Sequence, residues 1–204
     1  MAFDGYAMTT TQVNFDMSDI EALASRLGVA IEQIPYGISI ALNASMESAR
    51  SYLIGSTWPG GVHVRNTSFM NASLTTRGNK ASKRDLSVTL YDKLGRDYIV
   101  RQATGGTKTA RTGNVAIPNA VNVRRGAHGV VRSQRPRALQ NSFVKNGKIF
   151  QRQDKGLKLM YSLKNSVRVP KHVRMYEDGI SVLEREMARA LPAAFELAMS
   201  TARR

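Results

Sequence analysis

Apolar residues recur at three- and four-residue steps in two stretches near the N-terminus, the spacing that places side chains on one face of a helix. The first stripe consists of Ile20, Leu23, Leu27, Ile31 and Ile34. The second consists of Ile38, Leu42, Met46, Ala49 and Leu53. Ser18 and Glu21 have capping-box spacing, which predicts the start of the first helix. Pro35 either interrupts that helix or starts the second, which is predicted to end at Gly55.

A helical period returns near the C-terminus, from Glu177 onwards. The apolar positions that share a face there are Ile180, Leu183, Met187, Leu191, Ala194, Phe195 and Ala198. Acidic residues come early in this segment and Arg203-Arg204 closes it, which matches the polarity of a helix dipole. Pro192 predicts a kink, because proline cannot donate the backbone hydrogen bond of a regular helix.

The middle of the chain alternates apolar and polar residues over short runs, which is typical of strands. The predicted strands or extended segments are Thr10–Phe15, Leu86–Tyr91, Tyr98–Gln102, Val115–Val123 (broken by Pro118) and Leu157–Val169. Phe143–Phe150 is predicted to form a hairpin, since Asn146-Gly147 suits a tight turn of the primed type.

This layout predicts an α+β fold, with an N-terminal helix pair and a C-terminal helix packed on a mostly antiparallel sheet of four to five strands. Residues 1–17 are predicted to form an N-terminal arm and residues 18–204 a single domain. Two stretches rich in small and polar residues, 56–84 and 104–137, are predicted to be extended loops. Trp58-Pro59-Gly60-Gly61 is a predicted turn, and Trp58 is expected to cover the edge of the chain's own core rather than to anchor a partner.

Positive charge is concentrated in the centre of the chain. The chain has 30 Lys and Arg against 15 acidic residues, a formal net charge of +15. Residues 77–174 hold 23 of the basic residues and four of the acids, for a net charge of +19, while the two flanks together have a net charge of −4. Such a block needs polyanions, acidic protein neighbours or counterions close by.

Few patterns in the sequence favour catalysis or a cofactor. Cysteine is absent, which excludes disulfides and thiolate metal sites and fits a protein made in a reducing cytosol. No run approaches the roughly 20 apolar residues of a membrane span. The loop at Gly105–Thr109 is similar to a phosphate-binding loop, but Thr107 stands where that motif requires glycine. His63, His128 and His172 lack the spacing of paired zinc ligands. No enzyme activity, metal or cofactor is therefore expected.

The densest basic run is 124–137 (RRGAHGVVRSQRPR). Its arginines are Arg124, Arg125, Arg132, Arg135 and Arg137. Lys158, Lys164 and Arg168 alternate along the predicted strand 157–169 and are expected to form a basic stripe on one sheet face. These eight residues are the candidate contacts for DNA or for neighbouring subunits. His128 is the only ring in the run, whereas single-strand binders usually add stacking rings. Non-specific phosphate contact, contact with an acidic neighbouring subunit and a merely solvated loop all stay open.

Two parts of the chain resemble the minor tail protein Z family of long-tailed phages, also called tail completion proteins. In the N-terminal part the resemblance is carried by an apolar helix, Ile34-Pro35 and the small-residue segment Tyr36–Arg50 (YGISIALNASMESAR). In the C-terminal third it is carried by Phe143, Lys145-Asn146-Gly147, Phe150-Gln151-Arg152, Val169-Pro170 and the helix from Glu177. It covers roughly residues 18–55 and 138–204, and the middle shares only its basic character.

The resemblance implies a structural virion protein, assembled in the host cytoplasm, that joins head and tail at the head-proximal end of a phage tail. It implies a hexameric ring around the DNA channel, neighbouring tail and neck proteins as partners, and neither catalysis nor membrane contact. Non-specific contact with DNA in the channel is compatible with this role. The alternative is a free, non-specific nucleic-acid-binding protein, whose binding as a monomer would weaken steeply with salt.

Overall fold

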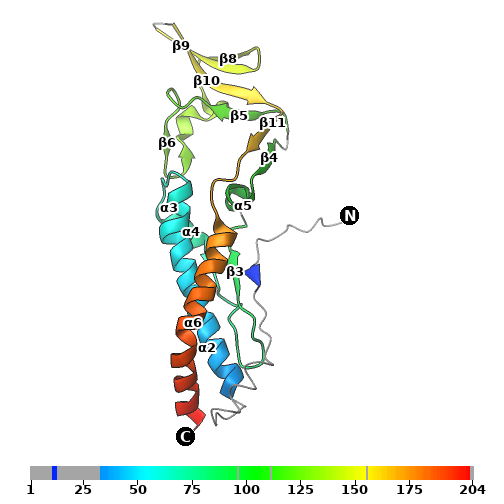
Figure 1. Cartoon of the computed structure of the whole chain (residues 1–204). Helices are drawn as coiled ribbons and strands as arrows, with labels where there is room; N and C mark the ends of the chain where they lie inside the picture. Colours follow the sequence, from blue (N-terminus) through cyan, green and yellow to red (C-terminus); the bar gives the residue numbers. More distant parts are fainter. Residues whose placement is uncertain (1–10, 13–32, 96, 111, 155, 203–204) are drawn as a thin grey trace.

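The computed structural model describes residues 11–12, 33–95, 97–110, 112–154 and 156–202. The molecule is elongated, with a helical body at one end and small antiparallel sheets at the other (Figure 1). The predicted helix from Ser18 lies outside the described residues apart from Gln33 and Ile34. The same holds for the predicted arm 1–17, of which only the strand β1 (Thr11–Gln12) is described.

One long helical rod begins the described body. It consists of α2 (Ile34–Tyr52), a π-helical turn η2 (Leu53–Thr57) and α3 (Trp58–Gly61). Pro35 lies in the first turn and therefore starts this helix, where its missing N–H is not needed. All five positions of the second apolar stripe are buried, as predicted. The predicted helix end at Gly55 is wrong, because the rod continues through the π turn.

The segment 58–61, predicted as a turn, is the last turn of this rod. The N–H of Trp58 donates to the carbonyl of Leu53, five residues back, so the wider π spacing directly precedes Pro59. This spacing accommodates a proline ring that a regular helix would not. Trp58 is buried in the core of the body, in line with the expectation that it packs on the chain's own core.

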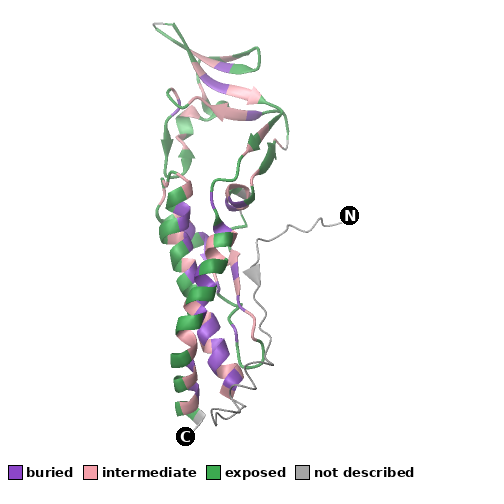
Figure 2. Cartoon of the chain, viewed as in Figure 1, coloured by how far each residue is buried: buried purple, intermediate pink, exposed green. Residues whose placement is uncertain are grey.

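The C-terminal helix α6 (Met175–Ala202) packs antiparallel along α2 (Figure 2). The side chain of Phe195 lies over Gly37, Ser45 Oγ lies 3.7 Å from the Sδ of Met187, and Gly179 faces the side chain of Leu53. The two residue numbers add up to the same value in all three contacts, as expected for two antiparallel helices. The register of the helix pair therefore does not shift along the contact. The predicted helix is confirmed, and it runs through Pro192 without interruption. Ile180 is an exception to the predicted buried face, because it is 45% exposed.

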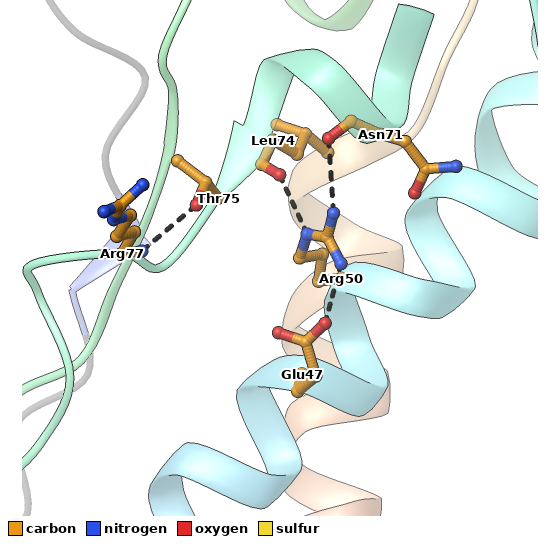
Figure 3. A network of polar contacts seen from close by, with 6 residues as sticks. All are labelled: Glu47, Arg50, Asn71, Leu74, Thr75 and Arg77. Carbon is orange, nitrogen blue, oxygen red and sulfur yellow. Dashed lines mark hydrogen bonds and ion pairs between the residues drawn. The ribbon is translucent and has the colours of Figure 1, made fainter. Parts of the chain in front are cut away.

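Irregular segments are fastened to α2 by two polar side chains. The guanidinium of Arg50 donates through Nε to the carbonyl of Leu74 (2.8 Å) and through a second nitrogen to that of Asn71, and it also pairs with Glu47 (Figure 3). The amide of Asn43 bonds both the N–H and the carbonyl of Ala81 at 2.9 Å. The stretch 56–84, predicted as a loop, is therefore held against the body. It also contains α4 (Ser68–Ser73) and β2 (Leu74–Thr75).

The region after these segments differs in part from the predicted strand pair. The strand β3 (Thr89–Asp92) lies between β1 and β2 and overlaps the predicted strand at 86–91. The predicted strand at 98–102 is wrong, since this segment is the helix α5 (Asp97–Thr104). Ile99 and Ala103 are both buried, whereas Arg101 between them is not, which fits the period of a helix and not the two-residue alternation of a strand.

Eight further strands lie beyond the body among the described residues. They are β4 (Gly106–Thr109), β5 (Val115–Pro118), β6 (Arg125–Gly126), β7 (Gly129–Val130), β8 (Ser142–Lys145), β9 (Lys148–Gln153), β10 (Gly156–Lys164) and β11 (Ser166–Val169). The largest sheet has the order β5-β10-β9-β8, β11 pairs with β4, and β6 pairs with β7, all antiparallel. The stretch 104–137, predicted as an extended loop, thus contains four of these strands.

The predicted hairpin at 143–150 is confirmed as β8 and β9. Asn146 and Gly147 have φ angles of 50° and 68°, the left-handed pair that a type I′ turn requires. The predicted single strand 157–169 is wrong, because it divides at Asn165 into β10 and β11, which belong to different sheets. The α+β class is confirmed, although the strands form several small antiparallel sheets instead of one.

The described residues have two separate apolar cores. The larger one belongs to the helical body and includes the buried faces of α2 and α6. The smaller one is formed by Val123, Ile149, Met160 and Tyr161, under the four-stranded sheet. We call residues 115–164, which surround this second core, the distal module, and β4 with β11 the connecting ribbon. No helix of the described ranges is long and apolar enough to cross a membrane.

Candidate functional site

The arginine run 124–137 is part of the distal module. It forms the short hairpin β6–β7 and two 3₁₀ turns, η3 (Arg132–Gln134) and η4 (Pro136–Ala138). All five arginines of the run are exposed. Within the described part of the chain, the one hydrogen bond from their guanidinium groups runs from the Nε of Arg135 to the carbonyl of Val130 at 3.4 Å. The structure therefore brings these five candidates together and turns them towards solvent.

Gln134 holds the backbone of this run on the sheet. Its Oε1 accepts the N–H of Arg124 at 2.7 Å, and its backbone carbonyl accepts the hydroxyl of Tyr161 at 2.6 Å. Tyr161 comes from the central strand β10 and is almost fully buried. Burial raises the pKa of its phenol, and the nearby charge of Arg125 opposes this shift in part. The phenol stays protonated and donates, so the arginine-bearing backbone is tied to the second core.

The other three candidates do not form the single stripe that was predicted. Lys158 and Lys164 lie on β10, whereas Arg168 lies on β11 in the connecting ribbon. A register shift between Leu159 and Tyr161 also breaks the strict alternation between the two lysines. All three side chains are exposed. They extend the basic surface over two sheets.

The outer part of the molecule is almost free of acidic residues. Residues 106–169 contain 14 Lys and Arg and a single acid, Asp154. Among the described residues of this range, no Lys or Arg has an ion-pair partner, since the ion pairs of the described residues lie on α2, on α6 and in the segment just before α6. Positive charges that are not neutralised within a chain attract anions and repel like copies. The described residues of the distal module and ribbon therefore form a surface whose positive charge is not balanced by acids of the same range.

A cleft of 690 Å³ lies where the body meets the β6–β7 hairpin. Three rings of the body line it: Trp58, Phe69 and Tyr98. Its cations are Arg65, Lys108 and Arg125, and its imidazoles are His63 and His128. Apart from Arg125, these residues were not among the candidate contacts predicted from the sequence. Trp58, Phe69 and Tyr98 are separated from one another and from the arginine run in the sequence. Only the folded structure places these rings and Arg125 in one cleft.

Among the described residues, no three His, Cys, Asp or Glu side chains lie together as a metal site would require. Catalysis was not expected from the sequence, and that expectation stays a prediction.

Comparison of the chain with family models, with curated proteins and with solved structures finds no match. The resemblance to tail completion proteins therefore remains an expectation based on the quoted motifs.

Proposed function

We propose that this chain is a structural virion protein that completes a phage tail and joins it to the head, as a hexameric ring around the DNA channel. The observation that supports this most is the division of the molecule into two parts. One is an apolar-cored helical body, and the other is a basic outer part whose described cations have no ion-pair partner. The body suits packing between subunits, and the basic part suits DNA phosphates.

Charge is the main argument for DNA at the centre. Each chain carries a formal +15, and a ring of such chains repels itself unless anions lie between them. DNA in the channel supplies a dense row of phosphates. Basic side chains that line the channel then contribute to assembly without reading sequence, because phosphate contacts carry no base information.

Ring symmetry multiplies weak contacts between the bodies. Ile180 and Leu197 of α6 are exposed apolar side chains, 45% and 51% accessible, on the surface of the body. Such residues offer neighbouring copies modest apolar contacts, and a closed ring repeats each contact once per subunit. A stable joint follows without high affinity between two isolated chains.

The proposal is tested by deleting the gene from the virus that encodes it. Filled heads and finished tails should then accumulate unjoined, and the native chain supplied in trans should restore joining. A variant with Arg124, Arg132, Arg135 and Arg137 changed to Gln should restore it poorly, since it removes four exposed charges and leaves both cores untouched. Normal joined particles in the absence of the chain would contradict the proposal.

A further inference from the structure

The cleft between the body and the β6–β7 hairpin is lined by aromatic rings and by cations that lie far apart in the sequence. Part of its lining comes from the end of α3 and the segment that follows it, and part from the hairpin β6–β7. The hairpin lies beside the end of α3 (Figure 1). Its volume of 690 Å³ lies within the range of about 300–1,000 Å³ that is common for ligand pockets. It is therefore large enough to hold a flat ring together with a charged group.

The rings of this cleft form a fixed cluster. Tyr98 meets Trp58 edge-to-face, with 5.8 Å between ring centroids and an interplanar angle of 78°. Tyr98 meets Phe69 in the same way at 6.2 Å and 66°. Trp58 is buried, whereas Tyr98 is 49% exposed. The two inner rings thus hold the ring of Tyr98 at the surface of the cleft, where a planar ligand can stack on it.

The charged lining of the cleft has one sign. Arg65, Lys108 and Arg125 are all exposed, and they come from three separate segments of the chain. No Asp or Glu belongs to the described residues that line the cleft. Arginine and lysine around an exposed aromatic ring are what proteins use to bind the backbone and bases of a single nucleic-acid strand.

We propose that this cleft binds a segment of single-stranded nucleic acid. A base stacks on Tyr98, and the adjoining phosphates are held by Arg65, Lys108 and Arg125. A duplex is disfavoured there, because its bases are stacked on each other and cannot reach a ring inside a cleft. The inference does not depend on the ring assembly proposed above, since one chain contains every residue that it uses.

The test is fluorescence anisotropy of the full-length chain with a labelled oligothymidylate and, in parallel, with a labelled duplex at the same salt concentration. Tyr98→Leu should weaken binding of the oligothymidylate about tenfold and leave the duplex almost unchanged. Tyr98→Phe keeps the ring and should bind like the native chain. Thermal unfolding of both variants checks that the body remains folded, and if the leucine variant is unstable the comparison of Arg125→Gln with Arg132→Gln decides the outcome.

A matched pair of charge variants separates the cleft from general attraction. Arg125→Gln and Arg132→Gln each remove one exposed charge from the same run, but only Arg125 lines the cleft. Arg125→Gln should weaken oligothymidylate binding several-fold more than Arg132→Gln. Equal losses for the two variants, or native binding by Tyr98→Leu, would overturn the proposal. Full displacement of the oligothymidylate by poly-glutamate at equal charge would overturn it as well, and would point to an acidic protein segment.

Discussion

Single polar side chains hold the irregular parts of this protein by bonding to backbone groups. Asn43 fixes Ala81, Arg50 fixes the carbonyls of Asn71 and Leu74, and Gln134 fixes the arginine run. Each partner lies between 10 and 38 positions away. No local pattern marks a Gln or an Arg for such a role, so these contacts could not be predicted from the sequence. The exposed arginines could be predicted, because charge alone keeps them in water.

The bond from Tyr161 to Gln134 gives a prediction at this scale. Tyr161→Phe removes the hydroxyl that donates to the carbonyl of Gln134 at 2.6 Å, and should lower the free energy of unfolding by about 1 kcal/mol at neutral pH. Urea unfolding of the native chain and the variant measures this difference. Tyr52→Phe, at a 41% exposed tyrosine, should change stability very little.

The same bond has a pH dependence of definite sign. The folded state raises the pKa of Tyr161 above the ordinary value of 10.0, chiefly by burial, so it favours the protonated phenol. The stabilisation is therefore fully present below pH 10.0 and is lost as the pH rises through the higher folded pKa. The stability difference between the native chain and Tyr161→Phe should shrink in that alkaline window. A difference that is constant across it would contradict this account.

At the scale of elements, long periodic patterns were predicted well and short ones were not. The stripes of α2 and α6 each extend over several turns, and a tertiary contact exists for nearly every predicted position. The hairpin β8–β9 follows from its Asn-Gly turn. In contrast, α5 has only eight residues, and a run of that length fits a strand or a helix almost equally well. Its helical state is decided by the burial of Ile99 and Ala103.

The residue at which the helical rod ends is set by tertiary packing and cannot be read from the positions of its glycines. Gly55, Gly60 and Gly61 are all available as helix stops, but a Cβ at Gly55 or Gly60 would meet no atom within 4 Å. A Cβ at Gly61 would lie 2.4 Å from the carbonyl oxygen of His172. The chain before α6 crosses the rod at this point, where the N–H groups of His172 and Val173 bond to the carbonyl of Gln102. The rod ends there because another segment occupies the space.

This crossing gives a prediction with a matched control. Gly61→Ala should destabilise the protein by about 2 kcal/mol, because the new methyl group meets backbone atoms that cannot move aside. Gly60→Ala has open space and should raise stability by about 0.5 kcal/mol, since alanine favours a helix more than glycine. Denaturant unfolding of both variants tests this. A similar change in both variants would show that the contact at His172 does not end the rod.

At the scale of the whole molecule, the sequence predicted the amount of charge but not its arrangement. Counting residues identified the basic block, and the structure adds that its outer part surrounds a second apolar core. The predicted class, α+β with antiparallel strands, holds because class follows from the order of the elements. The cleft could not be predicted, since it joins Tyr98 of α5 to Arg125 and His128 of the hairpin β6–β7. Such a site exists only after folding.

The central claim is that the bodies pack as a ring and the distal modules face DNA. The measurement that tests it most directly is a cryo-electron microscopy reconstruction of the particle that contains this chain. The account predicts a closed ring between the tail tube and the head, with the arginines of 124–137 pointing into the channel. A chain that is absent from that joint, or a ring whose distal modules point away from the channel, would contradict it.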